Sequence, residues 1–169
     1  QAEVDIVQGG LGKAYGVVGG FIAASARIVD FVRSHAPGFI FTTALPPTTA
    51  AGALASVRHL RASEAERRAL FARVAEVRAR IEALDLPLCS RDSQILPLLV
   101  GDAERCERVA QSLLELHGVY LQPINYPTVP RGTERLRITP TALHDAGMIE
   151  AFARALRDRL PDLKPARAA

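Results

Sequence analysis

Lys13 is the residue whose type and surroundings first suggest chemistry in this sequence. It lies in QGGLGKAYGVVGGF, residues 8–21, as the one charged side chain among six glycines. Of the 21 basic residues in the chain, Lys13 and Lys164 are the two lysines, and the others are arginines. Arginine stays protonated and forms no Schiff base, whereas a desolvated lysine amine can be neutral and nucleophilic. A lysine in this loop therefore indicates amine chemistry, with an incidental lysine on a surface turn as the alternative.

A glycine-rich loop with a lysine could also hold a nucleotide phosphate. The Walker motif G-x-x-x-x-G-K-[ST] fits Gly12 and Lys13, but it places its first glycine on Val7 and its hydroxyl residue on Ala14. The dinucleotide motif G-x-G-x-x-G places its third glycine on Tyr15. Both motifs are incomplete. Covalent attachment through the lysine is therefore the favoured interpretation, and phosphate binding without covalent chemistry remains an alternative.

The composition indicates a soluble globular protein. Of 169 residues, 49% are hydrophobic and 23% charged, and no apolar run approaches the about 18 residues of a membrane helix. No signal-peptide pattern is present, so we expect a cytoplasmic protein that binds no membrane. Arginines alternate with glutamates and aromatic residues make up 5%, which disfavours nucleic acid as a partner. Cys89 and Cys106 lack metal-ligand spacing, so we expect two buried, reduced thiols and no metal.

Apolar periodicity and capping residues predict alternating helices and strands, which is typical of an α/β architecture. We expect strands at 3–7, 20–25, 39–42, 95–100, 119–124 and 135–139, and helices at 26–36, 46–62, 64–84, 102–118 and 145–160. Residues 63–160 should make a compact unit and residues 161–169 a flexible tail. Residues 1–62 have too few strands to close a sheet, so we interpret them as the last part of a larger domain.

Three segments together resemble the α-oxoamine synthases. These segments are GGLGKAYGVVGGFIA at 9–23, RSHAPGFIFTTALPP at 33–47 and INYPTVPRGTERLRITPT at 124–141. The resemblance extends over about residues 4–160. It implies the aspartate-aminotransferase-like fold (PLP fold type I), with residues 1–62 as the end of the PLP-binding large domain and 63–160 as the small C-terminal α+β domain. It also implies pyridoxal 5'-phosphate as cofactor, glycine and succinyl-CoA as substrates, and a homodimer with the active site at the subunit interface.

The resemblance implies a role for each matched residue. Lys13 corresponds to the lysine that holds the cofactor covalently and later moves the α-proton of the substrate. Thr42 and Thr43 correspond to residues that reach the cofactor phosphate of the partner subunit. Arg137 corresponds to the arginine that binds the glycine carboxylate. Thr128 corresponds to a residue near the distal succinyl carboxylate, in a loop that closes over the active site.

The sequence also departs from the pattern of the family. Gly10 stands where a threonine is usual, which removes a hydroxyl expected near the cofactor phosphate, and Gln94 replaces a histidine. The lysine is residue 13, whereas in the family it lies past the middle of the chain. We therefore expect a C-terminal part that does not catalyse alone. The alternatives are a non-catalytic remnant or dimerisation module, and a sister synthase with another amino acid or acyl-CoA.

Overall fold

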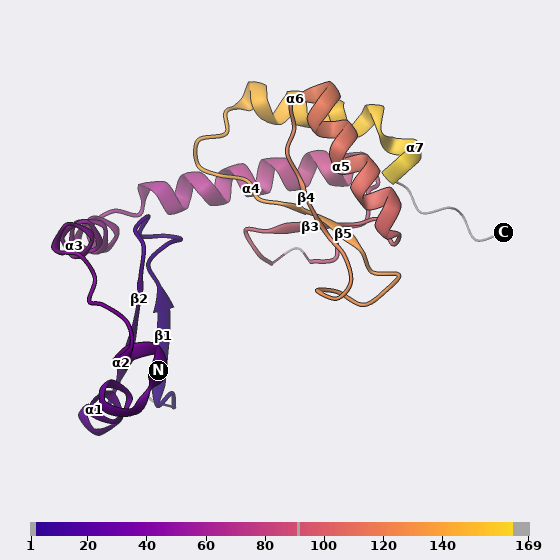
Figure 1. The fold of residues 1–169 in the computed structure, drawn as a ribbon. Coiled ribbons are helices and arrows are strands. Elements are labelled where there is room, and N and C mark those ends of the chain that lie inside the picture. Colours follow the sequence, from indigo (N-terminus) through magenta and orange to yellow (C-terminus); the bar gives the residue numbers. More distant parts are fainter. Residues whose placement is uncertain (1–2, 91, 164–169) are drawn as a thin grey trace. The chain divides into compact units, whose positions relative to one another are not determined.

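The structure is a computed structural model that describes residues 3–90 and 92–163. It divides into two compact units, Gln1–Glu64 and Ala65–Ala169, and each is described by itself. Both combine helices with antiparallel strands (Figure 1). The division falls two residues beyond the expected boundary between 62 and 63.

A β-hairpin is the centre of the first unit. Strand β1 (Ile6–Gly10) pairs antiparallel with β2 (Gly20–Ala24), in a register that runs from Ile6 opposite Ala24 to Gly10 opposite Gly20. The ring of Phe21 lies over Gly9, in the space that a Cβ at position 9 would need. A side chain at position 9 would therefore displace the Phe21 ring, and glycine lets the ring lie on the strand.

Three helices follow the hairpin: α1 (Ala26–His35), α2 (Pro37–Ile40) and α3 (Pro47–Ala62). The expected strand at 39–42 is wrong. The amides of Phe39 and Ile40 both donate to Ala36 O, at 2.9 and 3.0 Å, so this segment begins as a helical turn. Pro37 occupies the first helical position, where its fixed φ and missing N–H suit a helix start. This local effect outweighs the strand preference of the apolar residues that follow.

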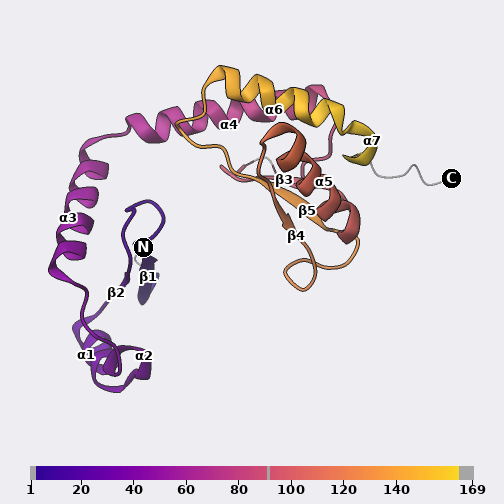
Figure 2. The same ribbon diagram turned by 45° about the horizontal axis from the view of Figure 1, so that its top comes forward.

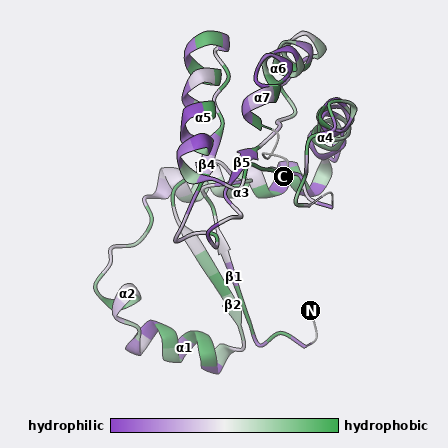
Figure 3. Ribbon diagram, turned by 90° about the vertical axis from the view of Figure 1, so that its right-hand side faces the viewer, coloured by the Kyte–Doolittle hydropathy of each residue, from purple (hydrophilic) through white to green (hydrophobic). Residues whose placement is uncertain are grey.

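The first unit contains very little core. Leu11 is the one buried hydrophobic residue among its described residues. Large apolar side chains are exposed on every element, including Val18 at 80%, Phe31 at 63% and Phe41 at 86%. Figure 3 shows apolar residues along β2 and α1. This unit cannot gain much of its stability from burying its own apolar surface.

The second unit packs helices against one side of a sheet (Figures 1 and 2). The strands are β3 (Leu96–Leu99), β4 (Gln122–Ile124) and β5 (Arg135–Ile138), in the antiparallel order β3-β5-β4. The helices are α4 (Ala65–Ala83), α5 (Ala103–His117), α6 (Ala146–Asp158) and α7 (Leu160–Leu163). The last strand in sequence is thus the middle strand of the sheet.

A continuous core lies between this sheet and the helices. Leu96, Leu98 and Leu136 point inward from the strands and are fully buried. The helices contribute the buried side chains of Val74, Val77, Ile81, Val109, Leu113, Ile149 and Leu156. Because side chains alternate along a strand, the residues between the buried ones on β3 and β5 lie on the opposite, open face of the sheet.

Local signals set both ends of α5. Asp102 caps α5 by accepting from the amide of Arg105 at 2.7 Å, and Gly118 closes the helix with φ +65°.

Residues 161–163, expected as the start of a flexible tail, lie in α7, and its Leu163 is fully buried in the core. Residues 164–169 lie outside the described residues. No helix in the described part is long and apolar enough to span a membrane.

Candidate functional site

Lys13 lies on the connection of the β1–β2 hairpin, residues 11–19. Backbone hydrogen bonds close this connection: Leu11 N donates to Gly19 O at 2.8 Å, Val17 N to Leu11 O at 3.1 Å, and Gly16 N to Lys13 O at 3.2 Å. Gly16 has φ +69° and Gly19 has φ +121°, both of which favour glycine. The glycines thus form a compact loop that presents an exposed lysine.

Contacts with neighbouring segments hold this lysine loop in place. The Ser56 hydroxyl on α3 donates to Tyr15 O at 2.9 Å. Val17 packs on α3 at Gly52, where a Cβ would come within 3.3 Å of Val17 Cγ1. Leu45, on the segment between α2 and α3, lies against Gly19. The loop is therefore supported on two sides.

The space beside two glycines of the hairpin is open. A Cβ at Gly12 would meet only Val17 O, at 3.9 Å, and a Cβ at Gly10 would meet nothing within 4 Å. Neither glycine has a positive φ. The backbone before Lys13 is thus accessible to a ligand, and Gly10 is not required by packing.

Thr42 and Thr43 lie in the segment that joins α2 to α3, and both are exposed. Thr42 N donates to Phe39 O at 3.4 Å, which continues the turn that ends α2. Within the described residues, neither hydroxyl has a hydrogen-bond partner. The structure places this segment beside the lysine loop through Leu45, and no hydrogen bond among the described residues joins either threonine to Lys13.

Arg137 lies at the centre of the open sheet face in the second unit. It is on the middle strand, opposite Pro97 of β3 and Gln122 of β4. Its neighbours Leu136 and Ile138 are buried, which turns the Arg137 side chain to the open side, where it is exposed. Among the described residues the guanidinium has no ion pair or hydrogen bond, so its donors remain available for a ligand.

Thr128 lies in the loop between β4 and β5, residues 125–134. Its amide donates to Asn125 O at 2.9 Å, and the preceding Tyr126–Pro127 bond is cis. The side chain is exposed, and its hydroxyl has no hydrogen-bond partner among the described residues. Lys13, Thr42 and Thr43 thus belong to the first unit, and Arg137 and Thr128 to the second.

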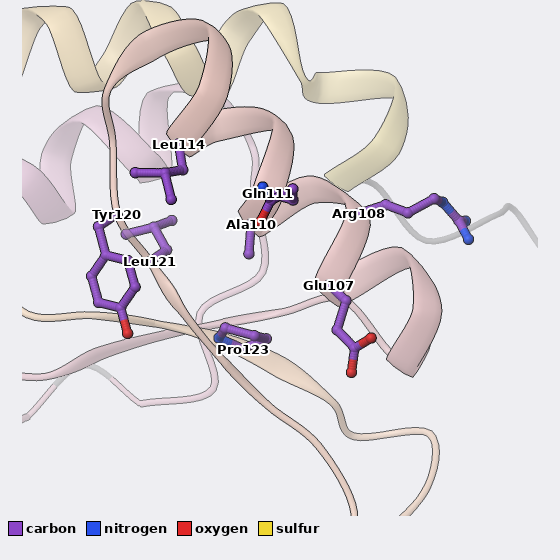
Figure 4. A pocket seen from close by; sticks show the side chains of 8 residues that line it. All are labelled: Glu107, Arg108, Ala110, Gln111, Leu114, Tyr120, Leu121 and Pro123. Carbon is purple, nitrogen blue, oxygen red and sulfur yellow. The ribbon is translucent and has the colours of Figure 1, made fainter.

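A hollow beside α5 contains none of these five residues. Its lining comes from α5 and from the chain leading into β4: Glu107, Arg108, Ala110, Gln111, Leu114, Tyr120, Leu121 and Pro123 (Figure 4). Pro123 pairs with the buried Leu136, so the hollow is on the helix-covered side of the sheet, opposite to Arg137. It is therefore separate from the candidate site.

The two cysteines differ from each other, and only Cys106 matches the expectation of a buried thiol. Cys106 is buried in the core, and burial raises the pKa of its thiol to about 11. Cys89 is exposed, so the expectation that both thiols are buried is wrong for this one. It follows Leu88, which forms an isolated bridge with Leu98, and its amide donates to Pro97 O at 2.9 Å.

Glu134 was missed by sequence reasoning. It is 4% exposed, and its carboxylate accepts from the amide of Gly132 at 2.9 Å. Its carbonyl accepts from the amides of Val100 and Gly101, both at 2.9 Å. A glutamate beside a strand that alternates arginine and apolar residues suggests an exposed side chain. No local pattern indicates that tertiary packing covers it.

Comparison with known proteins gives the family and its extent. Residues 1–156 match the protein family described as "Aminotransferase class I and II". A 5-aminolevulinate synthase from Bradyrhizobium diazoefficiens is 54% identical over 154 residues, which cover 91% of this chain and 38% of that protein. A mitochondrial 5-aminolevulinate synthase from Emericella nidulans is 48% identical over 161 residues, which cover 95% of this chain and 25% of that protein. The chain thus spans well under half the length of these relatives.

The fold is shared with solved enzymes. A serine palmitoyltransferase variant from S. paucimobilis, with a bound PLP–myriocin aldimine, aligns with a TM-score of 0.81 and 29% identity. The alignment covers 92% of this chain and 40% of that one. The expected aspartate-aminotransferase-like α/β fold is therefore confirmed.

Proposed function

The chain belongs to the aminotransferase class I and II family, and we propose that it is the C-terminal part of a 5-aminolevulinate synthase. That enzyme condenses glycine with succinyl-CoA to 5-aminolevulinate, CoA and CO2, the first step of heme and tetrapyrrole biosynthesis. The observation that carries the proposal is the similarity to enzymes of that name over nearly the whole chain. Residues 1–62 are then the end of the cofactor-binding large domain, and residues 63–160 the small domain.

The residues of the lysine loop fit pyridoxal phosphate. Lys13 presents an exposed amine on a supported loop, and the open space at Gly12 lets a flat ring approach the backbone. Thr42 and Thr43 offer hydroxyls that have no partner within the described residues, as a phosphate site requires. When bound, the cofactor serves as the electron sink that stabilises negative charge at the α-carbon of the substrate.

The side chains of this chain divide the remaining work. The amine of Lys13 removes the α-proton of glycine and later returns a proton to the product. Arg137 holds the glycine carboxylate with two parallel N–H bonds, which fixes the orientation of the α-carbon. The Thr128 hydroxyl donates to the distal carboxylate of the succinyl group, and closure of its loop excludes water.

The partners follow from the same proposal. Thr42 and Thr43 are exposed, and their proposed role is at the cofactor phosphate of a second subunit in a homodimer. The exposed apolar side chains of the first unit support its burial against other parts of the enzyme. A cytoplasmic location is proposed for the complete enzyme.

A second candidate function rests on the sparse core of the first unit. With one buried hydrophobic residue among those described, this unit is also suited to a binding or dimerisation module without catalysis. The two functions differ in whether Lys13 carries a cofactor.

Borohydride trapping separates these candidates. Pyridoxal phosphate is added to the chain and to a longer protein that includes upstream sequence, and each is reduced and mapped by mass spectrometry. We expect a pyridoxyl group on Lys13 of the longer protein, with 5-aminolevulinate formed before reduction, and none on the chain alone. Lys164 is the internal control for non-specific labelling. Absence of both label and product from the longer protein contradicts the proposed enzyme.

A further inference from the structure

The 125–134 loop is attached at both ends to the start of α5. At its first end, Asn125 Nδ2 donates to Glu107 Oε1 at 3.0 Å and lies 3.5 Å from Ala103 O. At its second end, Glu134 O accepts from the amides of Val100 and Gly101, which immediately precede the helix. The loop has ten residues including these two attachment residues, and it contains two internal turns.

The first attachment sets the position of Thr128 directly. Asn125 O accepts from the amides of Thr128 at 2.9 Å and Val129 at 3.3 Å. The side chain of Asn125 faces two acceptors on α5, so its amide nitrogen must point to the helix. The Oδ1 atom is buried and has no hydrogen-bond partner within residues 3–90 and 92–163. One residue therefore connects α5, through its side chain, to the backbone of Thr128, through its carbonyl.

The second attachment is built differently and does not depend on Asn125. Gly132, with φ +82°, forms a turn in which Thr133 N donates to Pro130 O at 3.1 Å, and the Glu134 carboxylate accepts from Gly132 N. The Arg131 guanidinium lies 4.6 Å from the ring centre of Tyr126, which joins the two arms of the loop. The backbone hydrogen bonds of the two arms are nevertheless separate, so the amides of each arm can be used to follow the order of that arm.

We propose that Asn125 and Glu107 are a positioning pair that fixes the first arm of the 125–134 loop on α5 and so presents the Thr128 hydroxyl to the acyl substrate. Glu107 lies on the exposed side of α5, at the end of the hollow and pointing away from Arg108 (Figure 4). The pair spans 18 residues of sequence. Its effect on substrate rests on the proposed function, whereas its effect on the loop does not.

Residue-resolved hydrogen exchange tests the positioning of the loop on the chain as it exists. Asn125→Ala and Glu107→Ala should each speed exchange of the Thr128 and Val129 amides about tenfold, since a charge-assisted hydrogen bond is lost. The Gly132 and Thr133 amides should change much less. Glu115→Ala is the matched control, because Glu115 on the same helix accepts from Gln111 Nε2 at 2.6 Å and does not contact the loop.

A reversal of polarity distinguishes positioning from a general loss of stability. Asn125→Asp alone places two carboxylates together and should loosen the first arm. Adding Glu107→Gln restores a donor and an acceptor and should return the Thr128 exchange rate to near that of the unmodified chain. Unchanged exchange in both alanine variants, or no rescue in the double variant, overturns the positioning pair. Circular dichroism of each variant verifies that the second unit remains folded.

Kinetics in the longer protein test the consequence for substrate. Asn125→Ala should raise the KM for succinyl-CoA about tenfold while the KM for glycine stays unchanged, because Thr128 and Arg137 bind different carboxylates. An unchanged KM for succinyl-CoA overturns the role of the pair in substrate presentation. If the longer protein makes no 5-aminolevulinate at all, the proposed function fails, and the exchange result still decides whether the pair positions the loop.

Discussion

Lys13 and Lys164 provide a direct comparison of two lysines with different expected roles. In the longer protein, Lys13→Arg should reduce turnover to background, because arginine keeps the charge but cannot supply a neutral amine. Lys164→Arg should leave turnover unchanged. The measurement is the rate of 5-aminolevulinate formation, with a melting curve to show that both variants are folded. Substantial activity in Lys13→Arg contradicts the assignment of this lysine.

Gly9 and Gly10 are adjacent but differ in the space around them. Gly10→Thr should be accepted, since nothing lies within 4 Å of the new Cβ, and it should slow the release of pyridoxal phosphate by adding a hydroxyl. Gly9→Thr is the contrasting variant, because its Cβ would overlap the Phe21 ring. Dialysis of the holoprotein, without borohydride reduction, measures the release of pyridoxal phosphate. Thermal unfolding shows whether each variant is accepted by the fold. A Gly10→Thr variant that loses cofactor faster would contradict this role.

The two thiols should react at very different rates. Cys89 is exposed and should react rapidly with a disulfide reagent in the folded chain, whereas Cys106 is buried with its pKa raised to about 11 and should react only after denaturation. The measurement is the release of thionitrobenzoate with and without guanidinium. Two rapid thiols in the folded chain are the contradicting result.

The raised pKa of Cys106 also gives a pH dependence of stability. Folding favours the protonated thiol, so this contribution is complete below pH 9.0 and is lost as pH rises toward about 11, where the unfolded chain has already ionised. The free energy of unfolding should therefore decrease across this range. Over the same pH interval, the free energy of unfolding should decrease less in the Cys106→Ala variant than in the Cys89→Ala variant, which keeps the buried thiol.

Among the elements, β5 was the one predicted most fully from sequence. Alternation in RLRIT indicates one buried and one open face, and the structure buries Leu136 and Ile138 while exposing Arg137. The segment at 39–42 shows the opposite case. Its apolar and aromatic residues favour a strand, but Pro37 begins a helical turn and no neighbouring strand pairs with it in the described residues. Strand preference needs a partner strand to take effect.

Adjacent positions on β5 should separate stability from binding. Leu136→Ala should lower the stability of the second unit by about 2–5 kcal/mol, because Leu136 is fully buried. Arg137→Ala should change it by about 0.5 kcal/mol or less, since the side chain is exposed, and should instead raise the KM for glycine in the longer protein. Urea unfolding and steady-state kinetics are the two measurements. Equal losses of stability in Leu136→Ala and Arg137→Ala would contradict a strand with one buried and one open face.

The contacts around the 125–134 loop could not be predicted in the same way. Asn125 meets Ala103 and Glu107 across 22 and 18 residues of sequence, and Glu134 is covered by the chain before α5. Such contacts depend on how helices and strands pack, which a local pattern does not contain. The types of residue at the candidate site were visible in the sequence, whereas the groups that hold them in place were not.

Considered together, the two units differ in how far each can stabilise itself. Residues 65–163 enclose a continuous core, whereas the first unit buries Leu11 and exposes most of its large apolar side chains. Residues 65–163 produced alone should unfold cooperatively on heating, and residues 1–64 alone should show no cooperative transition. Circular dichroism against temperature is the measurement. A cooperative transition in residues 1–64 contradicts this difference.

The strand order β3-β5-β4 has a consequence for synthesis of the protein. Strands β3 and β4 are not neighbours, so each relies on β5 as its partner strand, and β3 is otherwise paired only through the isolated bridge between Leu88 and Leu98 among the described residues. On the ribosome, neither strand can pair with β5 until about residue 138 has emerged from the exit tunnel. A chain that stops before residue 135 leaves both strands without their partner β5 and should be more open to proteases. The surface that carries Arg137 therefore forms only after β5 has been synthesised.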